Sequence, residues 1–165
     1  MERYVLITGS TGGLGKAYVK TCAENNWNIL LTGRDEIKLK DLKDSISEKY
    51  KNIKILYKAC DLAEESSRNE FIDFIKNKKI NIERLILNAG YITQGDFENS
   101  KQFDYLSAVR VNCEGNVDLF NKILKLKQEK EKLYVIVVSS FAGFNPMPYM
   151  AIYSASKAFL NSFFI

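Results

Sequence analysis

Short apolar runs alternate with amphipathic stretches along the whole chain of 165 residues, and this alternation limits the possible folds more than any other feature. The runs do not alternate apolar with polar residues, so a sheet built from them must be covered by helices on both faces. The five expected strands are residues 4–8, 28–32, 53–57, 84–88 and 134–138. The expected helices are residues 14–25, 36–50, 65–77, about 99–126, and one that starts near Ala151. This order predicts an α/β fold, a doubly wound parallel sheet of about five strands in one domain over residues 1–165.

The composition excludes several kinds of function. The chain has no histidine, so neither a histidine-based catalytic triad nor a histidine metal site can form. Cys22, Cys60 and Cys113 are far apart, as expected for packed thiols in a reducing compartment, and we predict no metal site. The net charge of +4 is spread along the chain, as in residues 125–132, which we expect to form a solvated helix end or loop. This scatter does not favour a nucleic-acid partner.

The N-terminal residues lead directly into the first apolar run. The sequence shows no signal peptide and no apolar segment long enough to cross a membrane. We therefore expect a cytoplasmic protein that binds neither nucleic acid nor a membrane.

A glycine-rich loop, Thr8-Gly-Ser-Thr-Gly-Gly-Leu-Gly15, lies between the first expected strand and the first expected helix. Glycines let the backbone turn sharply and approach a pyrophosphate, and a helix N-terminus offers N–H donors and the positive end of a dipole. A glycine-rich turn without a ligand is the alternative, but the strand before and the helix after favour a dinucleotide. The loop predicts a Rossmann-type cofactor site, in which the expected contacts from this loop are Gly9, Ser10, Thr11, Gly13, Leu14 and Gly15.

The second expected strand ends in Thr32-Gly-Arg34, without the Asp or Glu that a NAD-specific site places against the ribose 2′-hydroxyl. A guanidinium suits a 2′-phosphate, so Arg34 favours NADP(H) over NAD(H) as the cofactor. The alternative for Arg34 is a solvated surface arginine. Asp35, the next residue, is expected to cap the following helix.

Tyr153 and Lys157, in Tyr153-Ser-Ala-Ser-Lys157, are four residues apart and share one face of the last expected helix. A phenol titrates near pH ~10, so alone it is a poor acid or base at neutral pH. A lysine cation within hydrogen-bonding reach favours the phenolate, which makes the pair a candidate for proton transfer. An ordinary exposed pair on a helix is the alternative.

Taken in order, these motifs resemble those of one family, the short-chain dehydrogenases/reductases, over residues 4–165. The family's cofactor loop is matched by the glycine-rich loop, and its Asn-Ala-Gly motif by Asn88-Ala89-Gly90. Asp61-Leu62 resembles the pair that contacts adenine in this family. Because Gly12 and Gly13 are both present, the loop also fits the larger epimerase-like branch. The Tyr-Ser-Ala-Ser-Lys segment favours the simpler, single-domain reductases.

The resemblance implies hydride transfer between a nicotinamide and a small-molecule carbonyl or alcohol. Tyr153 is then the general acid or base, and Lys157 favours its phenolate and holds the nicotinamide ribose. Ser140, thirteen residues before Tyr153, is expected to hydrogen-bond the substrate oxygen. Asn112, in Val111-Asn-Cys-Glu-Gly115, is expected to hold a water that links Lys157 to solvent. Without the resemblance, Ser140 could simply cap a turn and Asn112 could be a buried helix residue.

The sequence ends eight residues after Lys157, inside the helix that carries the pair, whereas a complete sheet of this kind has six strands or more. The expected strand 134–138 has no outer partner, and the last residues are strongly apolar: Phe159, Leu160, Phe163, Phe164 and Ile165. We therefore expect a fold that lacks its C-terminal third and forms a homo-oligomer. The alternative function is an inactive nucleotide-binding module, or a fragment that needs a missing C-terminal portion or a partner.

Overall fold

The structure, a computed structural model, describes residues 2–127 and 132–164 and confirms the expected α/β class. Five parallel strands form one sheet in the order β3-β2-β1-β4-β5. The strands are β1 (Arg3–Thr8), β2 (Asn28–Gly33), β3 (Ile55–Ala59), β4 (Asn81–Leu87) and β5 (Tyr134–Val137). The helices are α1 (Gly13–Glu24), α2 (Glu36–Lys49), α3 (Glu65–Asn77), α4 (Gln102–Val109), α5 (Asn116–Leu126) and α6 (Ala151–Phe163). Between them lie two 3-10 turns and a π-helical segment: η1 (Phe97–Asn99), η3 (Phe141–Gly143) and η2 (Arg110–Gly115).

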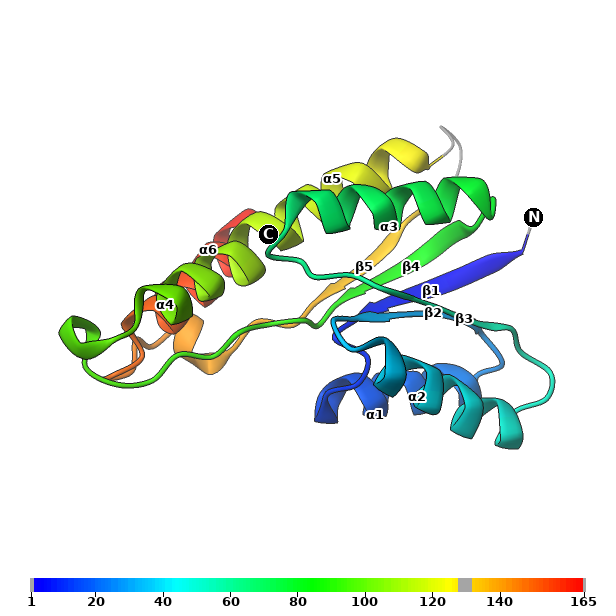
Figure 1. Cartoon of the computed structure of the whole chain (residues 1–165), viewed down its shortest axis with the longest axis horizontal. Coiled ribbons are helices and arrows are strands. Elements are labelled where there is room, and N and C mark those ends of the chain that lie inside the picture. The colour runs from blue at the N-terminus through cyan, green and yellow to red at the C-terminus, as the bar shows by residue number, and fades with distance from the viewer. Residues whose placement is uncertain (1, 128–131, 165) are drawn as a thin grey trace.

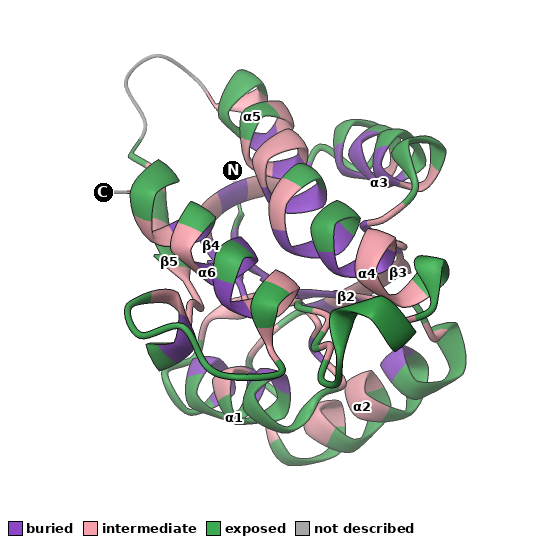
Figure 2. Ribbon diagram, turned by 90° about the vertical axis from the view of Figure 1, so that its left-hand side faces the viewer, coloured by how far each residue is buried: buried purple, intermediate pink, exposed green. Residues whose placement is uncertain are grey.

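The sheet lies between two layers of helices, with α1 and α2 on one face and α3, α4, α5 and α6 on the other (Figure 1). Successive residues of β1 point to opposite faces. Val5 and Ile7 pack with α1 and α2, whereas Tyr4 and Leu6 pack with α3 and α5. Figure 2 shows the buried residues gathered on the sheet and on the inward turns of the helices. This double cover explains why the strand sequences are apolar without alternation.

The strand order creates a crevice. β1 lies between β2 and β4, so the chain runs outward from β1 through β2 to β3 and then returns on the other side as β4 and β5. The loops that follow β1 and β4 diverge at the carboxyl ends of these strands. In an open parallel sheet, this switch point is where ligands bind.

Two strands differ from the expectation by more than one residue, β3 and β4. β4 begins at Asn81, three residues before the expected start, because polar Asn81 and Glu83 flank Ile82 and separate it from the apolar run. Its register with β1 shifts between Tyr4 and Val5, and Glu83 at this irregularity forms an ion pair with Arg3. β3 begins two residues late, at Ile55.

The single helix expected over about 99–126 changes its geometry in the middle. η1 precedes it, and the π-helical segment η2 joins α4 to α5. The Asn116 side-chain amide donates to the carbonyls of Val111 at 3.2 Å and Asn112 at 3.0 Å, both inside η2. The amide thus helps to satisfy carbonyls in a wider helical turn, an effect that hydrophobic spacing does not encode.

β5 forms an edge of the sheet, and β4 is its one strand partner among residues 2–127 and 132–164. Tyr134 and Ile136 of this strand and Phe159 and Phe163 of α6 are exposed. The exposed edge agrees with the expectation, and the homo-oligomer stays a prediction. Residues 128–131 of the charged segment, and Ile165, lie outside the described residues.

Within the same described ranges, no helix is both long and apolar enough to span a bilayer. No group of three or more His, Cys, Asp and Glu side chains in that part of the chain could hold a metal ion. The three cysteines are free thiols. Cys22 and Cys60 are buried, and burial raises the pKa of each thiol to about 11. The cytoplasmic location stays a prediction.

Candidate active site

A cleft of about 330 Å³ opens at the carboxyl ends of the strands, between the loops that follow β1, β2, β3 and β4. It lies at the crevice that the strand order predicts. Most of the cofactor contacts expected from the sequence line this cleft: Gly9, Thr11, Gly13, Leu14, Gly15, Arg34, Asp61, Leu62, Asn88, Ala89 and Gly90.

The glycine loop at the bottom of the cleft is closely packed against itself. Gly9 has a φ of +63°, a left-handed conformation that favours glycine. A Cβ atom on Gly15 would lie 2.1 Å from the carbonyl oxygen of Gly9, so no side chain fits at this position. α1 begins at Gly13 without a side-chain cap among the described residues, which leaves its first N–H groups available to an anion.

Ser10 is the one expected cofactor contact of this loop that does not line the cleft. The side chain is fully buried, and its Oγ lies 2.6 Å from the Ile7 carbonyl oxygen and accepts the Thr32 N–H at 3.0 Å. Ser10 therefore holds the loop against β2, and its side chain points into the fold and not into the cleft.

Thr8 and Asn88 join the loop after β1 to the loop after β4. Thr8 Oγ1 accepts the N–H groups of Asn88 and Ala89, both at 2.9 Å. The Asn88 side-chain amide donates back to the carbonyls of Thr8 at 2.9 Å and Gly9 at 3.2 Å. These bonds hold the two walls of the cleft at a fixed separation.

Arg34 lies exposed at the rim of the cleft. No hydrogen bond or ion pair from residues 2–127 and 132–164 engages its guanidinium. Asp35, next to it, caps α2 by accepting the Lys38 N–H at 3.0 Å, as expected. The carboxylate of Asp35 is thus occupied at the helix end, and the guanidinium of Arg34 is available to an anion.

Lys157 lies buried on α6, only 4% exposed. Its Nζ donates to the Val138 carbonyl oxygen at 2.8 Å and lies 5.7 Å from the centre of the Tyr153 ring. Burial lowers the pKa of Lys157, with an opposing contribution from Cys113. A Cβ atom on Gly90 would lie 3.5 Å from this Nζ, so the wall of the cleft reaches the lysine.

Asn112 is fully buried in the π-helical segment η2. Its Oδ1 accepts the Tyr91 N–H at 2.7 Å, and its Nδ2 donates to the Tyr91 carbonyl and the Ser156 hydroxyl, both at 2.9 Å. The Ser156 hydroxyl donates in turn to the Tyr153 carbonyl at 2.8 Å. Asn112 therefore ties the loop after β4 to α6 next to Lys157.

Ser140 begins the 3-10 turn η3, where its Oγ accepts the Ala142 N–H at 3.2 Å. Its O–H proton has no acceptor in the described part of the chain. The turn packs tightly on α6: a Cβ atom on Gly143 would lie 2.8 Å from the carbonyl carbon of Lys157, and Ser139 Oγ donates to the Lys157 carbonyl at 3.2 Å. These two contacts fix the position of the turn, and thus of Ser140, along the axis of α6, the helix that carries Tyr153.

The sequence did not identify every residue of the site. Ser156 was visible as the serine before Lys157, but its bond to Asn112 depends on how η2 packs against α6. Tyr91, which directly follows Gly90 of the Asn-Ala-Gly segment, also borders the cleft. Further residues line the cleft although the sequence did not predict them as contacts: Thr8, Gly12, Thr32, Gly33, Cys60 and Val111.

The family profile described as short chain dehydrogenase matches residues 3–165. The chain belongs to this family. Among its curated relatives, the Very-long-chain 3-oxoacyl-CoA reductase of Aspergillus oryzae is 30% identical over 164 residues, which are 96% of this chain and 46% of the relative. The Hydroxysteroid dehydrogenase-like protein 1 of Gallus gallus is 32% identical, over 98% of this chain and 49% of the relative. The chain thus spans about half the length of these curated relatives.

Solved structures of the short chain dehydrogenase type share the fold. The bulky-bulky ketone specific alcohol dehydrogenase from Comamonas testosteroni superimposes with a TM-score of 0.87 at 26% identity, over 97% of this chain and 64% of that one. L-sorbose reductase from Gluconobacter frateurii, complexed with NADPH and L-sorbose, gives a TM-score of 0.90 at 22% identity, over 98% and 61%. The doubly wound architecture and its crevice are therefore those of the family.

Proposed function

We propose that this chain binds NADP(H) and takes part in hydride transfer between the nicotinamide and a carbonyl/alcohol pair. The observation that carries this proposal is the place of Lys157, buried beside Tyr153 and in reach of the cleft wall at Gly90. A buried lysine costs folding free energy, because burial disfavours its charged form. Such a group at the end of a dinucleotide-type cleft is typical of a functional site.

Two features of the cleft fit a dinucleotide, the start of α1 and Arg34. The close approach of Gly15 to Gly9 leaves room for a pyrophosphate at the start of α1, which has no side-chain cap among the described residues. Arg34 has no competing partner in the described ranges and suits a 2′-phosphate, so NADP(H) is favoured over NAD(H). The NADPH in the Gluconobacter structure belongs to that protein, and it makes NADPH the natural probe here.

The nicotinamide, when bound, supplies the hydride. Tyr153 would donate a proton to the carbonyl oxygen in reduction, or take it back in oxidation. Lys157 would favour the phenolate electrostatically. It would hold a ribose hydroxyl with an N–H other than the one that it donates to the Val138 carbonyl, because an ammonium has three donors. The unused O–H of Ser140 would donate to the substrate oxygen as charge develops there.

The role of Asn112 is narrower than the sequence implies. Both ends of its side chain are engaged by Tyr91 and Ser156. A water held by Asn112 must therefore use a remaining lone pair, either of Oδ1 or of the backbone carbonyl, which already accepts the Asn116 amide at 3.0 Å. We propose that Asn112 acts first by holding the Tyr153 helix against the loop after β4, and that any proton relay uses one of these two oxygens.

Exposed apolar side chains on the loops beside α6 favour an apolar substrate. Phe141, Phe144, Met147 and Tyr149 are exposed on the loop that leads into α6, and Ile92 is exposed on the loop after β4. The names of the curated relatives suggest 3-oxoacyl thioesters and steroid ketones as first compounds to test. Polar sugars, such as L-sorbose, serve as the contrasting substrate class.

A fluorescence titration with NADPH, followed by a ketone panel, tests the proposal. We expect saturable NADPH binding, weaker NADH binding, and oxidation of NADPH that depends on an apolar ketone. Absence of NADPH binding would rule the proposal out. Binding without turnover would support the second candidate, a nucleotide-binding module that needs further chain or a partner.

A further inference from the structure

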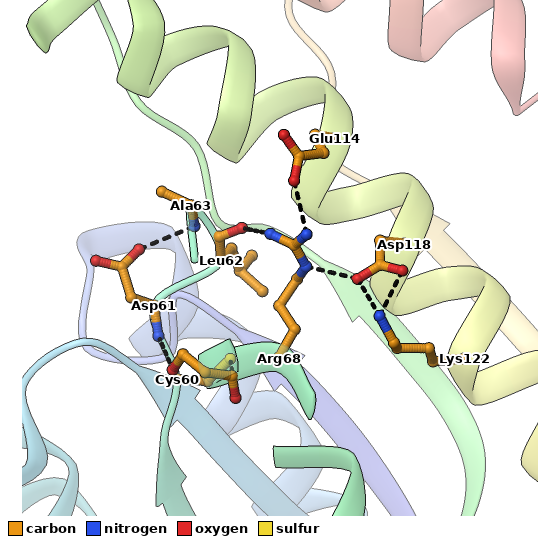
Figure 3. Close-up of polar contacts among 9 residues, drawn as sticks. Cys60, Asp61, Leu62, Ala63, Arg68, Glu114, Asp118 and Lys122 are labelled. Carbon is orange, nitrogen blue, oxygen red and sulfur yellow. Dashed lines mark hydrogen bonds and ion pairs between the residues drawn. The ribbon is translucent and has the colours of Figure 1, made fainter. Parts of the chain in front are cut away.

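Arg68 of α3 is the most deeply buried charged side chain that the proposed chemistry does not use. Its side chain is only 2% exposed. Figure 3 shows its guanidinium reaching three acceptors at once. Nη1 donates to the Leu62 carbonyl at 2.6 Å, Nε to Asp118 at 2.6 Å, and Nη2 to Glu114 at 2.7 Å.

The Leu62 carbonyl belongs to the loop that forms the Asp61 side of the cofactor cleft. A Cβ atom on Gly115 would lie 2.5 Å from the same carbonyl oxygen, so the loop packs directly against η2. No other hydrogen bond reaches the Leu62 carbonyl in residues 2–127 and 132–164. Arg68 and Gly115 together therefore set the position of Leu62 and, through the chain, that of Asp61.

The loop has its own internal bonds, which Arg68 complements. Asp61 accepts the Ala63 N–H at 2.9 Å, and its own N–H donates to Ser67 Oγ at 2.9 Å. These contacts fix the shape of the loop relative to α3. The Arg68 bonds to Glu114 and Asp118 add polar links from α3 to η2 and α5, beside the close contact at Gly115.

Replacing Arg68 would not leave either of its carboxylate partners buried without a cation or water. Glu114 is 52% exposed and can return to water, and Asp118 keeps a second cation, Lys122. A buried ion pair often adds little to stability compared with apolar residues of similar size. What an apolar residue cannot do is donate to the Leu62 carbonyl, so the specific contribution of Arg68 is to placement.

We propose that Arg68 is a positioning residue for the adenosine side of the cofactor, acting through the Leu62 carbonyl and anchored by Glu114 and Asp118. Arg68 itself is not among the residues that line the cleft. A guanidinium is needed because its planar donors can meet one carbonyl and two carboxylates in a fixed geometry. The inference rests on the proposed NADP(H) site.

Arg68→Met tests the proposal, with NADPH and 2′,5′-ADP as the two probes. Because 2′,5′-ADP carries only the adenosine half, we expect both dissociation constants to rise by the same factor, about ten-fold. In turnover assays the KM for NADPH should rise by that factor, and kcat should stay within about two-fold. Arg68→Lys keeps the cation and one donor direction, so we expect it to restore part of the affinity.

Two control variants separate positioning from general loss of stability. Ile75→Ala opens a cavity on the same helix without touching the Arg68 contacts, so it should lower the unfolding temperature and leave 2′,5′-ADP affinity intact. Lys122→Met removes the second cation from Asp118 and should also leave affinity unchanged. If Arg68→Met loses no more affinity than Ile75→Ala, the role is only structural and the proposal is wrong.

Asp118→Asn provides a test that survives if Arg68→Met does not fold. The amide oxygen can still accept from Arg68, but the charge that anchors the guanidinium is lost, and we expect about three-fold weaker 2′,5′-ADP binding. Unchanged affinity in this variant would overturn the proposal. Failure of the wild-type chain to bind NADPH would instead remove the proposed function, so the two failures are distinguishable.

Discussion

The two sides of the candidate site differ in how firmly the chain holds them. On the cofactor side, Thr8 and Asn88 cross-link two loops with four hydrogen bonds of 2.9–3.2 Å. Arg68 braces a third loop from within. On the substrate side, the loops before α4 and α6 meet through a backbone hydrogen bond from Gly95 to Tyr149 at 2.8 Å, and their apolar side chains are exposed.

This contrast separates two abilities. The proposed cofactor side is cross-linked by hydrogen bonds between its loops, all within the described residues. The proposed substrate side presents Tyr153 and Lys157 on α6 next to exposed apolar surface and an open sheet edge. Exclusion of water from a reacting centre needs a cover, and these loops do not provide it within residues 2–127 and 132–164. We therefore expect binding of the cofactor to be more robust than turnover.

The largest effect is expected for Tyr153→Phe, which acts on the substrate side alone. Loss of the phenolic proton donor should lower turnover by about 10²–10⁴-fold, whereas the NADPH dissociation constant should stay within about two-fold. Ketone-dependent NADPH oxidation and fluorescence titration measure the two quantities. Tyr134→Phe removes a hydroxyl from the exposed edge strand and serves as the control. Wild-type turnover by Tyr153→Phe would contradict the assignment.

Gly15→Ala tests whether the cofactor side is as tightly packed as its contacts indicate. The new methyl group would meet the Gly9 carbonyl at 2.1 Å, a backbone atom that cannot move aside. We expect a loss of about 3 kcal/mol of unfolding free energy, measured without cofactor by denaturant titration.

Gly13→Ala is the matched control, because no atom lies within 4 Å of the Cβ position there. It should be neutral or stabilise the chain by up to about 1 kcal/mol, since alanine restricts the unfolded state. Equal stability losses in the two variants would show that the loop is not constrained at Gly15.

Arg34→Gln tests whether the cofactor side prefers NADPH over NADH. Loss of a charge-assisted contact to the 2′-phosphate should weaken NADPH binding by about 10–100-fold. NADH, which lacks that phosphate, should bind as before. Lys40→Gln, an exposed cation on α2, is the control for a general loss of positive charge. If NADPH and NADH weaken together, Arg34 does not read the 2′-phosphate.

The same contrast marks what the sequence could predict. Residues of the cofactor side follow strands directly, so Gly9, Asn88 and Asp61 could be placed from the order of elements alone. Residues that act through packing could not. The bonds of Asn112 depend on a π-helical turn stabilised by Asn116, and hydrophobic spacing predicts only a continuous helix there.

Arg68 shows the limit most clearly. In the sequence it is one of 24 lysines and arginines, in a helix with polar neighbours, and nothing local predicts that it is buried. Its two carboxylate acceptors, Glu114 and Asp118, lie 46 and 50 residues further along the chain. Only the packing of α3 beside α5 brings them together (Figure 1). Ser10 is the reverse case, because its motif predicted a cofactor contact and packing uses its side chain within the fold.

The smallest expected effect is the contribution of the Asp118 charge to the free energy of unfolding. Burial raises the pKa of Asp118, but hydrogen bonds from Lys122 and Arg68 outweigh it and lower that pKa below its ordinary value of 3.8. A lowered pKa in the folded state means that the unfolded chain binds more protons, so the stabilisation is present above pH 3.8 and disappears as the pH falls through the lower folded value.

Wild type should therefore be more stable than Asp118→Asn by about 1 kcal/mol at neutral pH, and the difference should vanish in strong acid. Asp73→Asn, which breaks an exposed pair with Lys76, should show no such pH dependence. Urea titrations at a series of pH values measure both. A difference that stays constant with pH would mean that Asp118 contributes through shape, and the brace on the cofactor side would then depend on packing at Gly115 more than on charge.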